Sequence, residues 1–184
     1  MREIEIKLRV DNLEELEKKL TDSGLVISKE IAQHDVIYSN TKDTHSFVES
    51  YEGCIILRIR KENGVSIINL KKQRSYEMDN IEYETEVKDG EAIHNILLLL
   101  GWTPEVEVKK VRKKGKLKEY EICLDRVEKL GDFVELEKLT DENADPEKVR
   151  EELFKELEKF GLTKDQEETK GYDTQIYQLE NNIK

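Results

Sequence analysis

The N-terminal run MREIEIKLRV, residues 1–10, decides the fold of this chain. From residue 3 to residue 10 every odd position is charged and every even position is apolar. An alternation with a period of two is typical of a β-strand that turns one face toward a hydrophobic core. The other face carries acids first and bases after them: Glu3, Glu5, Lys7 and Arg9. This charged face is therefore either the water-exposed side of a sheet or the wall of a binding site.

A strand that contains Glu-x-Glu, followed by an amphipathic helix that stops at glycine, occurs three times in the sequence. The predicted helix termini carry suitable residues, with Asp11 and Asp145 as N-caps and Pro146 at the first helical position. The repeat predicts strands that are joined by helices. The three strand–helix pairs are 3–10 with 11–24, 83–87 with 89–101, and 133–137 with 144–161.

Five further segments have the composition of strands: residues 34–40, 54–60, 65–72, 106–113 and 117–127. Gly64 and Gly115 are predicted to mark hairpin turns between neighbouring strands. The last residues, 173–184, predict a short helix that either caps one end of the sheet or packs against it. We therefore expect an α+β fold of about eight mostly antiparallel strands, which stays open or closes into a barrel.

Composition excludes several classes of protein. The chain has 184 residues, of which 40% are charged, and its net charge is −11. The acidic balance argues against binding to a nucleic acid polymer, although a small polyanion remains compatible with it. No apolar run suggests a membrane span or a signal peptide. We expect a single domain over residues 1–184, located in the cytoplasm, with Cys54 and Cys123 as free buried thiols.

Like charges gather on the polar faces of several predicted strands. Acids repel one another at such spacing unless a positive charge lies between them. A divalent cation would remove that penalty, and oxygen ligands suit Mg²⁺ or Mn²⁺. Strands rich in Arg and Lys would then bind a polyanion carried by the metal. Each of four strands carries such a group on one of its faces: Glu82, Glu84 and Glu86; Glu135 and Glu137; Arg58 and Arg60; and Lys110 and Arg112.

The pattern Glu-x-Glu-x-Lys at residues 3–7 resembles the signature of the CYTH superfamily, the triphosphate tunnel metalloenzymes. Similarity continues in order along the chain, through LRIR at 57–60, NLKKQR at 69–74, VKKVRKK at 108–114 and KGY at 170–172. The segments EICLDRV at 121–127 and LGDFVELE at 130–137 look most like the class IV adenylyl cyclase branch.

This resemblance implies a closed eight-stranded antiparallel β-barrel, the triphosphate tunnel, with helices packed outside. Mg²⁺ or Mn²⁺ would be the cofactor, with Glu3, Glu5 and Glu137 as metal ligands and Glu135 beside them. Glu84 and Glu86 would orient the basic residues. Lys7 and Asp125 are the catalytic candidates, and Asp125 would activate or orient the nucleophile unless it simply pairs with a neighbouring lysine. The residues that would bind the triphosphate are Lys7, Arg58, Arg60, Lys71, Arg74, Lys110 and Arg112.

Two reactions fit the resemblance. A class IV cyclase converts ATP to cyclic AMP and pyrophosphate, whereas a triphosphatase hydrolyses inorganic tripolyphosphate or an organic triphosphate such as thiamine triphosphate. A non-catalytic protein that binds polyphosphate or nucleotides is the alternative outside enzymes. The expected partner is a small molecule that contains a triphosphate, and related cyclases suggest a homodimer.

Overall fold

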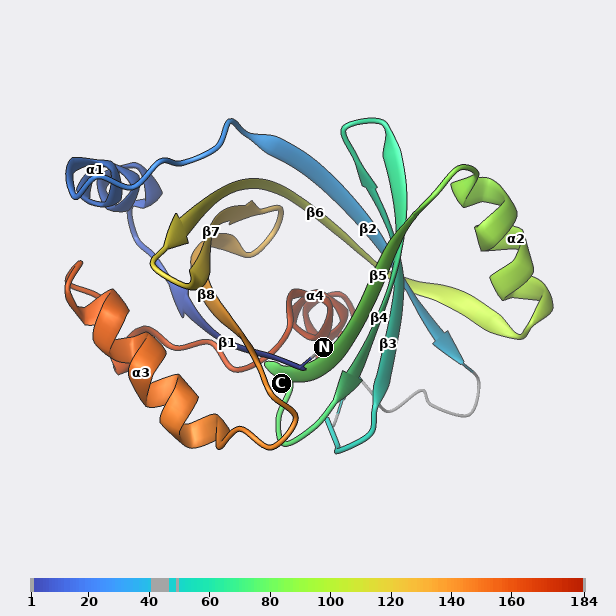
Figure 1. Cartoon of the computed structure of the whole chain (residues 1–184). Coiled ribbons are helices and arrows are strands. Elements are labelled where there is room, and N and C mark those ends of the chain that lie inside the picture. Colours follow the sequence, from blue (N-terminus) through green and yellow to red (C-terminus); the bar gives the residue numbers. More distant parts are fainter. Residues whose placement is uncertain (1, 41–46, 49, 184) are drawn as a thin grey trace.

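The strands of the barrel account for most of the first 140 residues. The computed structural model describes residues 2–40, 47–48 and 50–183 (Figure 1). The strands are β1 Arg2–Arg9, β2 Ile31–Asn40, β3 Ile55–Glu62, β4 Val65–Gln73, β5 Asp79–Val87, β6 Trp102–Leu117, β7 Tyr120–Val127 and β8 Gly131–Thr140. The helices are α1 Leu13–Asp22, α2 Gly90–Leu99, α3 Pro146–Glu158, the short 3₁₀ helix η1 Lys164–Gln166, and α4 Tyr172–Glu180.

The eight strands form one closed antiparallel barrel in the order β1-β5-β4-β3-β2-β6-β7-β8. This confirms the expected α+β architecture and excludes the open sheet. Closure turns the odd positions of β1 toward the lumen, while Ile4, Ile6 and Leu8 face outward and are fully buried under α1 and α3. The alternation in the first ten residues therefore separates an outer hydrophobic core from a charged interior.

Local chemistry explains where the outer helices begin. Asp145 accepts hydrogen bonds from two backbone N–H groups at the start of α3, and Pro146 is its first residue, as predicted. The predicted cap of α1 was wrong by one position. Asn12, not Asp11, accepts the hydrogen bond from the backbone of Glu15 at 3.0 Å, because α1 begins at Leu13.

The two predicted glycine turns have different outcomes. Gly64 lies in the turn between β3 and β4 with φ +81°, next to Asn63 at φ +50°, which is the geometry expected for a tight hairpin. Gly115 instead lies inside β6, and that hairpin turns at Lys118 with φ +59°. Gly115 is needed for close packing, because a Cβ atom there would lie 2.7 Å from Cδ1 of Ile27.

One end of the barrel is covered by α4, the predicted C-terminal helix, which lies behind the opening in Figure 1. At this end the inward-facing side chains are apolar, and Tyr172 and Ile176 of α4 pack among them. The barrel residues in this seal are Ile37, Val106, Val108, Val127 and Phe133. No helix among the described residues is long and apolar enough to cross a membrane.

Candidate functional site

The lumen encloses a cavity of about 360 Å³ with a strongly charged lining. Side chains from all eight strands reach it directly, together with the first turn of α4. Asp125 lies behind the lining, whereas Arg74 and Glu86 lie away from it. The predicted site residues that line the cavity are Glu3, Glu5, Lys7, Arg58, Arg60, Lys71, Glu84, Lys110, Arg112, Glu135 and Glu137.

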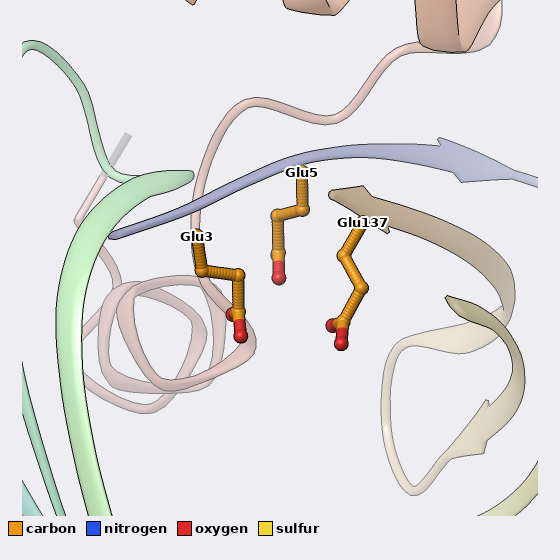
Figure 2. Close-up of side chains that lie close together, drawn as sticks. All are labelled: Glu3, Glu5 and Glu137. Atoms are coloured by element: carbon orange, nitrogen blue, oxygen red, sulfur yellow. The ribbon is translucent and has the colours of Figure 1, made fainter. Parts of the chain in front are cut away.

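Three carboxylates, which we call the acid cluster, converge near the middle of β1. Glu3, Glu5 and Glu137 each offer an oxygen atom, and these oxygens lie within 4.8 Å of one another. Figure 2 shows the three side chains pointing from β1 and β8 into the same space. Strand register causes this convergence, because Glu5 lies directly opposite Glu137 on β8, and Glu137 lies opposite Glu121 on β7. Like charges directly opposite one another destabilise a sheet.

Counter-charges for the acid cluster are scarce. Lys71 pairs with Glu3 at 3.1 Å, but no ion pair reaches Glu5 or Glu137 from any residue that the structure describes. Burial, and then the charge of Glu135, raises the pKa of Glu5 to about 7. Burial and the neighbouring glutamates raise the pKa of Glu137 to about 9. A group of three carboxylates with a single ammonium partner is short of positive charge and fits a hard divalent cation such as Mg²⁺ or Mn²⁺.

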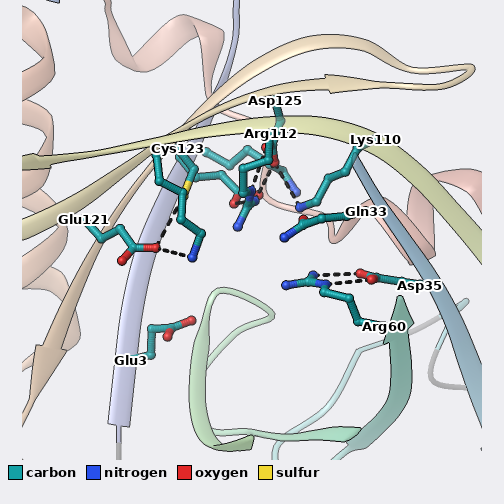
Figure 3. A network of polar contacts seen from close by, with 12 residues as sticks. Glu3, Gln33, Asp35, Arg60, Lys110, Arg112, Glu121, Cys123 and Asp125 are labelled. Carbon is teal, nitrogen blue, oxygen red and sulfur yellow. Dashed lines mark hydrogen bonds and ion pairs between the residues drawn. The ribbon is translucent and has the colours of Figure 1, made fainter. Parts of the chain in front are cut away.

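A second set of carboxylates in the same lumen is fully paired; we call it the paired cluster. Asp125 is completely buried, and it accepts hydrogen bonds from Nε of Arg112 at 2.7 Å and from Nζ of Lys110 at 3.0 Å (Figure 3). Burial alone would raise the pKa of Asp125, but Arg112 and Lys110 outweigh it and lower that pKa. Arg112 also binds Glu135. Glu135 is therefore turned toward a base and does not join the acid cluster.

Two further acids hold basic side chains of the lining in place. Asp35 accepts two hydrogen bonds from Arg60, at 2.7 and 2.8 Å, and lies 3.5 Å from Arg58. Glu82 pairs with Lys71 at 2.9 Å and with Arg58 at 3.6 Å. Among the acids on this face of β5, Glu82 is therefore the one that pairs with basic side chains of the lining.

The remaining acids predicted on β5 have weaker connections to the bases. Glu84 lines the cavity and accepts a hydrogen bond from Asn69 at 3.2 Å. Glu86 is exposed near the end of the strand. Arg74 follows the last residue of β4, and its backbone N–H donates to the carbonyl of Asp79 in the next turn. The lumen face of β4 is carried by odd positions such as Asn69 and Lys71, so the alternation itself does not direct position 74 into the lumen.

Tyr172, in the KGY segment, is a lumen residue to which the sequence alone assigned no role. Its ring lies beneath two ammonium groups, with Nζ of Lys7 at 4.3 Å and Nζ of Lys110 at 4.8 Å from the ring centroid. Nζ of Lys7 also donates a hydrogen bond to the carbonyl of Lys170, just before α4. At the closed end of the cavity two ammonium groups therefore lie over an aromatic floor.

Known proteins resemble this chain over nearly its full length. The CYTH domain family matches residues 1–172. A protein of Methanocaldococcus jannaschii named "Putative adenylate cyclase MJ0240" is 33% identical over 94% of this chain and 97% of its own. "Adenylate cyclase CyaB" of Aeromonas hydrophila is 24% identical over 94% and 87% of the two chains. The solved structure of the PH1012 protein of Pyrococcus horikoshii superposes with a TM-score of 0.79 at 29% identity, covering 95% of this chain and 98% of that one.

Proposed function

This chain belongs to the CYTH domain family, and we propose that it is a metal-dependent enzyme that converts ATP to cyclic AMP and pyrophosphate. The observation that carries the proposal is the arrangement of charge in the lumen. Three carboxylates that lack sufficient positive charge, one of them buried and two half-buried, share one cavity with six basic side chains of β3, β4 and β6. A metal complex of a triphosphate brings a cation that the carboxylates can bind and an anion that the basic side chains can bind. The names of the two relatives support a nucleotide as the substrate.

The acid cluster would hold the metal ion. Glu3, Glu5 and Glu137 are its ligands in this proposal, and the bound ion would neutralise charge on the phosphate oxygens. Deprotonation of Glu5 and Glu137 must accompany metal binding, because their pKa values are raised to about 7 and about 9. Metal affinity should therefore increase as the pH rises.

The chain's own residues position the triphosphate and stabilise the leaving group. In the cyclase reaction the 3′ oxygen of the ribose bonds to the α-phosphorus as its proton leaves. The bond from that phosphorus to the bridging oxygen then breaks, and pyrophosphate departs. Arg58, Lys71 and Arg112 carry positive charge into the cavity and would stabilise the charge that develops on pyrophosphate. Phosphoryl chemistry of this kind depends mainly on positioning and charge.

Asp125 acts in this proposal as a positioning residue. Its carboxylate is buried behind the lining and is already bound by Arg112 and Lys110, which lower its pKa. An acid in that state is a weak proton acceptor near neutral pH. It instead fixes the direction in which the two basic side chains enter the cavity.

Product analysis tests the proposal. The protein is incubated with ATP, and separately with tripolyphosphate, in the presence of Mg²⁺, Mn²⁺ or EDTA. We expect cyclic AMP and pyrophosphate from ATP with either metal and no product in EDTA. Glu5→Gln should abolish turnover while the protein stays folded, and the exposed Glu158→Gln should not change it.

Two outcomes would contradict the proposal. Cleavage of tripolyphosphate without any cyclic nucleotide from ATP would replace the cyclase by a triphosphatase. Tight binding of both compounds without any product would instead indicate a protein that only binds polyphosphate or nucleotides.

A further inference from the structure

Lys71 is the single basic side chain that forms an ion pair with the acid cluster among the residues that the structure describes. Its Nζ atom donates a hydrogen bond to Glu3 at 3.1 Å and lies 2.9 Å from a carboxylate oxygen of Glu82 on the neighbouring strand β5. Lys71 and Glu82 lie directly opposite each other in the sheet. The ammonium group is therefore shared between one acid of the proposed metal site and one acid outside it.

A metal ion in the acid cluster would need the same carboxylate of Glu3 that Lys71 contacts. The carboxylate oxygens of Glu3, Glu5 and Glu137 lie within 4.8 Å of one another, so an ion bound between them would lie close to the ammonium group. Two positive charges at such short range in a partly buried site repel each other strongly. Lys71 and the metal ion therefore compete for Glu3.

Glu82 is held in place by side chains other than Lys71. Asn69 donates a hydrogen bond to Glu82, and a guanidinium nitrogen of Arg58 lies 3.6 Å from it. These two side chains belong to β4 and β3, which carry no member of the acid cluster. A lysine side chain is long and flexible, so its ammonium group can leave Glu3 and stay with Glu82 while the backbone keeps its position.

We propose that Lys71 is the internal counter-ion of the acid cluster in the metal-free protein, that a divalent cation displaces it from Glu3, and that Glu82 retains the displaced ammonium group. Glu82 is thus a positioning residue, which acts on the metal site through Lys71 and does not bind the metal itself. This inference rests on the proposed function, because it takes the acid cluster as the metal site.

The exchange of cations links the metal to the anion that accompanies it. An ammonium group has three N–H donors, and displacement frees the donor that Lys71 gives to Glu3. Lys71 lines the cavity, so the freed donor becomes available to an anionic oxygen inside it. Metal binding should therefore precede or accompany the binding of an anion at Lys71.

Titration of Mg²⁺ alone into the metal-free protein tests this exchange without any triphosphate. The affinity is measured by calorimetry at pH 9, which limits competition from protons for the carboxylates. Lys71→Met removes the competing cation and should tighten Mg²⁺ binding about tenfold. The matched control is Lys72→Met, at the next residue of β4, whose exposed side chain should leave the affinity unchanged. An unchanged or weaker affinity in the Lys71 variant would overturn the proposal.

A double-mutant cycle with Glu82→Gln separates the exchange from a general effect of charge. Glu82→Gln removes the acid that retains Lys71, so Mg²⁺ should bind about tenfold more weakly than in the parent. In the Lys71→Met background the same substitution should change the affinity at most about threefold, because no ammonium group remains to be retained. An equal loss in both backgrounds would show that Glu82 acts only through its own charge and would contradict its role as a positioning residue.

Thermal unfolding gives a second readout of the same competition. In EDTA the Lys71→Met variant should melt at a lower temperature than the parent, because its acid cluster has lost its counter-ion. Mg²⁺ should then raise the melting temperature of the variant more than that of the parent. A variant that folds only with Mg²⁺ would show the same preference in a stronger form, and equal shifts in the two proteins would contradict the exchange.

The result with Mg²⁺ also separates this inference from the proposed reaction. If Mg²⁺ does not bind to the parent, the acid cluster is not a metal site and the exchange is wrong with it. If Mg²⁺ binds to the variants in the expected order but ATP yields no cyclic AMP, the proposed reaction is wrong and the exchange is confirmed.

Discussion

The acid cluster and the paired cluster lie in the same lumen and are built from the same kind of residue, yet the pKa values of their acids shift in opposite directions. Glu5 and Glu137 have raised pKa values, whereas Asp125 and Glu135 have lowered ones. Burial pushes all four pKa values upward. The difference therefore comes from neighbours, because only the paired cluster contains Lys and Arg within bonding distance of each acid.

Strand register explains which acids have a basic neighbour. Asp125 on β7 faces Arg112 on β6, and Glu135 on β8 faces Lys7 on β1. The acid cluster breaks this pattern, since Glu137 has Glu5 on one side and Glu121 on the other. Several acids of the described barrel therefore face bases, whereas Glu5, Glu137 and Glu121 form a row of acids that face acids. In the proposed function, this row is the place where a cation from outside the protein would bind.

The largest effect is expected when the paired cluster is broken. Asp125→Asn removes the charge that neutralises Arg112 and Lys110, and it should lower the free energy of unfolding by about 3–5 kcal/mol, the usual cost of leaving a buried charge unpaired. Urea unfolding of the metal-free protein measures this change. A loss below about 1 kcal/mol would mean that water reaches this cluster and that the two clusters differ less than we describe.

The same kind of substitution in the acid cluster should have the opposite sign. Glu137 has a folded pKa of about 9 against an ordinary value of 4.5, so between these pH values the folded protein binds more protons than the unfolded chain. Its stability therefore falls as the pH rises through this window. Glu137→Gln should flatten that fall and stabilise the metal-free protein at pH 8, on the order of 1–3 kcal/mol.

Thermal unfolding from pH 5 to pH 9 in the presence of a chelator measures this second effect. The metal-free parent should lose stability across the range, and the Glu137→Gln variant should lose less. A variant that is less stable than the parent at pH 8 would show that the Glu137 carboxylate has a stabilising partner within the fold.

Much of the barrel could be predicted from the sequence, because the alternation within a single strand is enough to show which of its side chains face the lumen. The period-two alternation assigned the lumen face of Glu3, Lys7 and Arg112 without any knowledge of neighbouring strands. Glycine was less reliable as a turn signal, since Gly115 serves close packing inside β6 and the chain turns three residues later. A missing side chain is compatible with a turn and with close packing, and only the tertiary structure distinguishes them.

The division of the lumen acids into two clusters could not be predicted in this way. Glu135 and Glu137 share a face of β8 and resemble each other in sequence, but one faces Lys7 and the other faces Glu5. That difference depends on the register between strands more than a hundred residues apart. The same limit explains why Glu82 was not recognised as the partner of Lys71.

Proton release on metal binding tests most directly whether the acid cluster is a metal site. Mn²⁺ is titrated calorimetrically into the metal-free protein at pH 7 in buffers that differ in ionisation enthalpy. Because Glu5 and Glu137 have pKa values of about 7 and about 9, binding of one ion should release between about one and two protons. Glu137→Gln should reduce both the affinity and the proton release, and Glu158→Gln should change neither. Binding without proton release, or release that is unchanged in the Glu137 variant, would contradict the assignment.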